Sequence, residues 1–90
     1  MENLAIGTIE ANLLNGVLQR HPDYIEGYEV LAQIYAADDG LVAAERTYQR
    51  ALQHTERVEG LTRLHQHLGE VHFLQHRPTD AEREFQEALQ

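Results

Sequence analysis

One spacing of residues occurs twice in this chain, and this internal repeat limits the folds open to it more than any other feature. In each copy a flat ring, a leucine followed by a small residue, and a second flat ring precede an alanine, an aromatic residue and another alanine. A chain that repeats one such unit folds as tandem copies of one supersecondary element. The paired positions, each 37 residues apart, are Tyr28 and His65, Leu31 and Leu68, Ala32 and Gly69, Tyr35 and His72, Ala44 and Ala81, Tyr48 and Phe85, and Ala51 and Ala88.

Between four groups of turn residues, the apolar residues follow the helical period. They recur at steps of three and four over segments of about 12 to 20 residues. No segment of useful length alternates apolar and polar residues as a β-strand would. The turn groups occupy 21–23 (HPD), 38–40 (DDG), 54–56 (HTE) and 76–80 (HRPTD). The sequence therefore predicts an all-α protein of about five helices.

Two of the predicted helix starts carry the pattern of a capping box. Asp23 precedes Glu26 by three residues, and Thr79 precedes Glu82 by three residues. In this pattern the two side chains bond to backbone amides that would otherwise lack a partner. We also expect Gly40 to relax the tight connection between the second and third helices.

The length, net charge and composition of the chain limit both the size of its core and the classes of ligand it can bind. With 90 residues the chain forms one domain, 1–90, with a small core. A formal net charge of −8 argues against nucleic acid and against an anionic membrane surface as ligands. The absence of cysteine excludes disulfides and thiolate chemistry. Because the N-terminal segment lacks the pattern of a signal peptide, and no stretch approaches the roughly 20 apolar residues of a membrane span, we expect a cytoplasmic protein.

The two copies resemble tetratricopeptide repeats, whose pattern places a large aromatic residue, Leu-Gly, Tyr, and then Ala, an aromatic residue and Ala at matching spacings. The resemblance implies a short right-handed helical-repeat solenoid of antiparallel helix pairs. It divides the chain into a partial repeat helix at 4–22, repeat one at 23–55 and repeat two at 56–90. The offset of 37 exceeds the usual 34 residues, so we expect extra residues near 55–61 to lengthen the fourth helix.

In the family that the chain resembles, the first helix of each unit lines a concave groove. The clamp of Lys, Asn and Arg with which some members bind a chaperone's C-terminal carboxylate is missing, since Val30 and His67 are among the residues in the matching places. The groove positions implied by the resemblance are Glu26, Glu29, Gln33, Ala36 and Ala37 in repeat one, and Arg63, Gln66, Glu70, Phe73 and Leu74 in repeat two.

Four of the six histidines lie within residues 65–76, and their spacing allows three interpretations. His65 and His72 occupy aromatic slots of the repeat, so their rings are expected to pack as substitutes for Trp and Tyr. A zinc site from His65, His72 and His76 is the second interpretation, although no Asp or Glu completes that helix face. In the third interpretation, protonation of these rings near the ordinary histidine pKa of about 6.5 would weaken the small core in which they pack.

No motif of an enzyme appears in the sequence, and no cofactor is implied. We therefore expect a non-catalytic module that binds a peptide or a helix of another protein in its groove. The alternative is a self-associating scaffold element, present as a homo-oligomer or as a fragment of a longer repeat array. Its association surface would be the apolar residues of the last helix, Ala81, Phe85 and Leu89.

Overall fold

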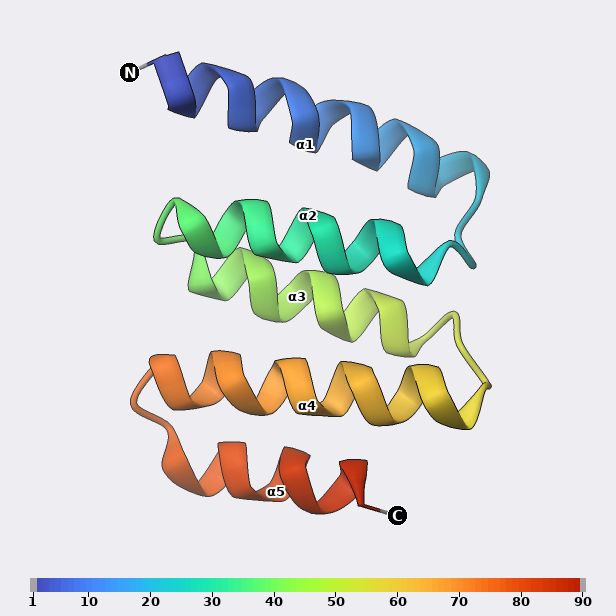
Figure 1. The fold of residues 1–90 in the computed structure, drawn as a ribbon, viewed down its shortest axis with the longest axis vertical. Coiled ribbons are helices and arrows are strands. Elements are labelled where there is room, and N and C mark those ends of the chain that lie inside the picture. Colours follow the sequence, from blue (N-terminus) through green and yellow to red (C-terminus); the bar gives the residue numbers. More distant parts are fainter. Residues whose placement is uncertain (1, 90) are drawn as a thin grey trace.

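The computed structural model describes residues 2–89 of the chain and the side chains of residues 7–89. Within these residues the chain forms five α-helices and no strand (Figure 1), so the predicted all-α class is confirmed. Met1 and Gln90, the ends of the expected 1–90 domain, lie outside the described residues. The helices are α1 (Glu2–Arg20), α2 (Ile25–Ala37), α3 (Leu41–Leu52), α4 (Val58–Leu74) and α5 (Pro78–Ala88).

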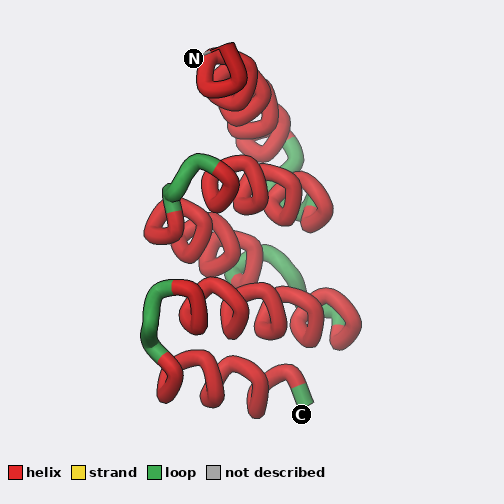
Figure 2. The backbone as a smooth tube through the Cα atoms, turned by 60° about the vertical axis from the view of Figure 1, so that its left-hand side comes forward, coloured by secondary structure: helices red, strands yellow, loops and turns green. Residues whose placement is uncertain are grey.

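Successive helices run antiparallel and lie side by side in chain order, from α1 at one end to α5 at the other (Figure 1). Figure 2 shows the same order from a second direction. The most extensive packing lies within two hairpins, α2–α3 and α4–α5, while α1 packs on α2 and α3 packs on α4. The molecule is accordingly flat, with extents of 39 × 30 × 14 Å. The right-handed turn of a solenoid stays a prediction.

The 37-residue offset of the sequence is also an offset between structural elements. Helix α2 ends at Ala37 and α4 ends at Leu74, while α3 begins at Leu41 and α5 begins at Pro78. Helix α4 has 17 residues against the 13 of α2, and the additional turn lies at its N-terminal end. The predicted lengthening of the fourth helix is therefore confirmed.

The two hairpins turn in the same way, through a residue with left-handed backbone. Asp39 has φ 60° and His76 has φ 61°, at equivalent places after α2 and α4. The amide of Gly40 donates to the carbonyl of Tyr35 at 2.8 Å, and that of Arg77 donates to the carbonyl of His72 at 2.9 Å. These are Schellman turns, in which the backbone itself satisfies the last carbonyls of the helix.

The predicted capping boxes are wrong. Helix α2 begins after Tyr24 rather than Asp23, and α5 begins after Arg77 with Pro78 as its first residue. Neither cap residue makes a side-chain hydrogen bond to the helix start. Proline explains the early start of α5, because its fixed φ suits the first helical position and its missing N–H needs no partner there.

The small residues at the repeated positions are buried in the core. Ala32 and Ala44, from the two helices of the first hairpin, are fully buried, and Leu31 and Leu68 are buried to within 1%. Helices α4 and α5 approach closely at Gly69, whose neighbour is the ring of Phe85 on α5. A Cβ added to Gly69 would lie 2.5 Å from Cε1 of that ring. Glycine thus allows α4 and α5 to pack as closely as they do.

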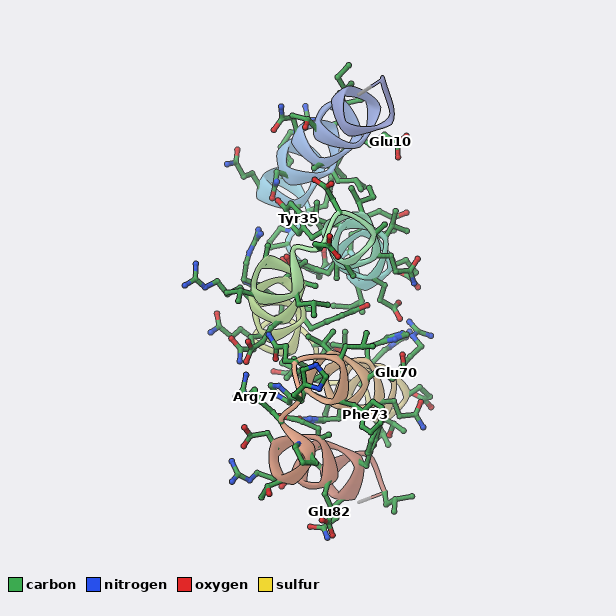
Figure 3. All side chains as sticks on the ribbon, turned by 90° about the vertical axis from the view of Figure 1, so that its left-hand side faces the viewer. Glu10, Tyr35, Glu70, Phe73, Arg77 and Glu82 are labelled. Atoms are coloured by element: carbon green, nitrogen blue, oxygen red, sulfur yellow. The ribbon has the colours of Figure 1, made fainter. Side chains whose placement is uncertain are left out.

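Helix α1 packs on α2, on the side of the first hairpin opposite α4. Leu18 is 1% exposed and Ala11 is 6% exposed, so both belong to the core. Glu10 lies on the exposed surface (Figure 3), because the small buried residue of this helix is its neighbour Ala11. None of the helices in residues 2–89 combines the length and the apolar character needed to cross a bilayer.

Candidate functional site

The groove residues implied by the sequence lie on α2 and α4, and most of them are exposed. Phe73 is 67% exposed and Leu74 is 57% exposed, next to each other near the end of α4. The side chains of Glu70 and Phe73 project to the same side of the molecule (Figure 3). The other exposed residues of the predicted set are Glu26, Gln33, Ala37, Arg63 and Gln66, and Ala36 is half-buried.

Glu29 differs from the rest of the predicted groove, because it is only 9% exposed. Its Oε2 accepts a hydrogen bond from Arg63 Nε at 2.8 Å and lies 3.0 Å from His67 Nε2. Both partners belong to α4, so the carboxylate connects α2 with α4 across the hairpins. Glu29 is thus a structural link between the two helices that carry the candidate face.

Tyr48 of α3 also belongs to this cluster, through its contact with His67. Its ring stacks on that of His67, with centroids 5.2 Å apart and planes within 11°. Burial, together with the negative charges of Glu29 and Glu70, raises the pKa of Tyr48 to about 12. The phenol therefore stays neutral at any physiological pH. Residues from three helices hold the face of α2 and α4 in one geometry.

A second polar cluster joins α3, α4 and α5 around His72, which is 3% exposed. Gln75 Nε2 donates to Glu45 Oε1 at 3.2 Å, and Arg77 Nη1 donates to Glu45 Oε2 at 3.0 Å. Although burial raises the pKa of Glu45, the hydrogen bonds from Gln75 and Arg77 and the charge of Arg77 bring it below its ordinary value. Arg77 Nε also donates to Asp80 at 2.8 Å and lowers its pKa. This network fixes the second hairpin on the first.

The burial of His72 confirms the predicted packing role of its ring. The spacing of the histidines does not show, however, that a carboxylate of α5 lies between the two histidines of the repeat. Glu84 Oε2 lies 2.7 Å from His65 Nδ1, and Glu84 Oε1 lies 3.7 Å from His72 Nε2. His76 is exposed in the turn before α5. Among residues 7–89 no three His, Asp or Glu side chains converge as a metal would require.

The helix periodicity alone does not reveal Glu45, Gln75 or Glu84, because their partners lie on other helices. The repeat does not reveal Glu84 either, because Glu84 stands 37 positions after Thr47, whose hydroxyl donates to the carbonyl of Ala43 at 2.8 Å. A signal was nevertheless present. Where one repeat replaces an aromatic ring with histidine, a carboxylate on the adjacent helix supplies the polar partner that the ring nitrogens need.

An open recess lies where α1 turns into α2. Its volume is about 480 Å³, and its lining combines apolar and acidic side chains. Tyr24, in this lining, is 46% exposed. The lining residues are Val17, His21, Asp23, Tyr24 and Glu26.

The residues expected to mediate self-association have different surroundings from one another. Ala81 is 3% exposed and so is packed within the hairpin rather than presented to a partner. Phe85 is 38% exposed, since one part of its ring lies against Gly69. Leu89 is 86% exposed. The apolar surface on α5 is therefore smaller than the sequence predicts.

No family model, curated protein or solved structure matches the chain.

Proposed function

We propose that this protein is a non-catalytic module of the tetratricopeptide-repeat type that binds a peptide or a helix of another protein along α2 and α4. One observation carries the proposal. Phe73 and Leu74 are 67% and 57% exposed side by side, on the face where Glu70 also projects (Figure 3). Adjacent exposed apolar side chains surrounded by polar ones are typical of a surface that binds another protein.

The rigidity beneath this face supports the proposal. Glu29, Arg63 and His67 connect α2 with α4. The ring of Tyr48, on α3, stacks on that of His67. A surface held in one conformation binds with a smaller loss of conformational entropy than a mobile one. A cytoplasmic location belongs to the same proposal, because the cysteine-free chain is compatible with a reducing compartment.

Selection from a random peptide library displayed on phage tests this function. We expect the protein to enrich a set of related peptides, and we expect the Phe73→Ala, Leu74→Ala variant to lose that enrichment while its circular dichroism spectrum is unchanged. Leu89→Ala serves as the control, since Leu89 is 86% exposed and lies outside the proposed face. Equal enrichment by the parent and the double variant would contradict the proposal.

The second candidate function is self-association, favoured by the exposed apolar residues of α1 and α5. Ile9 and Leu13, one helical turn apart on α1, are 59% and 66% exposed, and Leu89 at the end of α5 is 86% exposed. Two such surfaces on one molecule allow copies to associate end to end. Light scattering over a dilution series tests this candidate, and a mass that stays at one chain at every concentration would reject it.

A further inference from the structure

We propose that the partner of the α2–α4 face is a basic segment that also carries an apolar side chain. Its cations would face Glu26 and Glu70, and its apolar side chain would pack on Phe73 and Leu74. This inference rests on the proposed function and adds the chemistry of the partner. The argument depends on charge, on the order of side chains along α4, and on the recess beside Glu26.

The exposed charge of α2 and α4 is negative. Helix α2 contains two glutamates and no basic residue, and α4 contains Glu59, Glu70 and Arg63. The guanidinium of Arg63 is bound to Glu29 at 2.8 Å. Among the described residues no arginine pairs with Glu26 or Glu70, and His67 Nδ1 lies 3.9 Å from Glu70 Oε2. The remaining basic residues, Arg20, Arg46, Arg50, Arg57, Arg77 and Arg83, belong to other helices or to the connections between helices.

Along α4, acidic and apolar groups lie close together on one surface. Gln66, Glu70, Phe73 and Leu74 follow one another at helical steps of four, three and one, so they share one side of the helix. Figure 3 shows Glu70 and Phe73 on the same side of the molecule, with Glu10 of α1, while Arg77 projects to the opposite side. A partner that packs an apolar side chain on Phe73 therefore brings its neighbouring residues beside a carboxylate.

The recess at the start of α2 adds a place for a cation. Asp23 and Glu26 supply two carboxylates, and the exposed ring of Tyr24 supplies an aromatic face. An arginine or lysine side chain is attracted by both kinds of group. The start of α2 and the end of α4 lie at opposite ends of the face (Figure 1), so one extended or helical segment that crosses the face would meet both.

An acidic partner does not fit this surface. Carboxylates brought beside Glu26 and Glu70 would meet like charge, which costs affinity and disfavours wrong partners. Nucleic acid carries phosphate charge of the same sign as the protein, whose formal net charge is −8. The favoured occupant is therefore a cationic protein segment.

Three fluorescent synthetic peptides of equal length test the inference by anisotropy. The first combines arginines with leucines at helical spacing, the second replaces each arginine with glutamate, and the third replaces each leucine with serine. We expect only the first to bind. We expect Glu70→Arg and Phe73→Ala each to weaken its binding about tenfold, and we expect added salt to weaken binding by the parent protein.

The control variant is Glu82→Arg, which makes the same change of charge on α5, away from the face (Figure 3). It should leave binding unchanged. Equal weakening by Glu82→Arg and Glu70→Arg would show unspecific attraction by net charge and would overturn the inference. Binding of the glutamate peptide, or failure of all three peptides, would also overturn it. In either case the phage selection decides separately whether the face binds peptides at all.

Discussion

The carboxylate of Glu29 on α2 and the guanidinium of Arg63 on α4 are joined by a hydrogen bond of 2.8 Å, although the two helices belong to different hairpins. His67 approaches the same oxygen at 3.0 Å. One atom of Glu29 thus fixes the spacing between the two helices of the candidate face. The stability of the molecule and the shape of its binding surface depend on the same contact.

Glu29→Gln should lower the free energy of unfolding by about 1–3 kcal/mol, because it removes charge-assisted hydrogen bonds at a mostly buried position. Urea denaturation followed by far-ultraviolet circular dichroism measures this loss. The matched control is Glu26→Gln, one turn earlier on the same helix and exposed, which should change stability by less than about 0.5 kcal/mol. Equal effects of the two substitutions would show that the contact with Arg63 contributes nothing.

Gly69→Ala should destabilise the protein by about 1–3 kcal/mol, because overpacking forces neighbouring atoms to shift. The new Cβ would lie 2.5 Å from the ring of Phe85. Gly16→Ala provides the control, since a Cβ at that position of α1 has no neighbour within 4 Å. There alanine should stabilise the helix by about 0.5–1 kcal/mol. Thermal unfolding of both variants checks the opposite signs, and a stabilised Gly69→Ala protein would contradict the packing described.

His76→Gly should stabilise the protein by about 0.5–1 kcal/mol. Left-handed backbone costs a residue with a Cβ about 1–2 kcal/mol, and the greater freedom of glycine in the unfolded chain offsets part of the gain. His76 has φ 61°, whereas its neighbour Gln75 has φ −83° and gains nothing from glycine. Denaturant unfolding should therefore show Gln75→Gly as less stable than the parent. If both glycine variants lose stability alike, relief of backbone strain is not the dominant effect.

Acid should weaken the protein through Glu45. The folded-state pKa of this carboxyl lies below its ordinary value of 4.5, so the folded state binds the proton less readily than the unfolded state. The resulting stabilisation is complete above the ordinary value and is lost as the pH falls through the folded-state pKa. Glu45→Gln should therefore be less stable than the parent at neutral pH, with a smaller further loss in acid. Unfolding curves at neutral pH and near pH 4 measure this difference, and identical pH dependences would rule out this role.

Helix class and repeat offset could be predicted because both follow from local spacing. The period of the apolar residues and the match between Leu31 and Leu68 require no knowledge of distant contacts. The helix ends were harder to predict. The turns at Asp39 and His76 rest on backbone hydrogen bonds, and neither position carries the glycine that usually indicates such a turn.

The family resemblance implied that Glu70, Phe73 and Leu74 line the candidate face, and all three side chains are exposed. The burial of Glu29 was not predictable. It depends on how closely α2 approaches α4, which brings together residues 34 positions apart. The position of Glu84 between His65 and His72 depends in the same way on the packing of α5. Such contacts are set by tertiary distances that periodicity does not contain.

The chain-order packing of the helices has a consequence for how the molecule opens. Because α1 packs chiefly on α2, and α5 on α4, either outer helix can detach without breaking the packing of the other. Amide hydrogens should then exchange with solvent fastest in α1 and α5 and slowest in α2, α3 and the middle of α4. A partner that bridges α2 and α4 would bind two inner helices of the chain, and its recognition would survive fraying of α1 and α5.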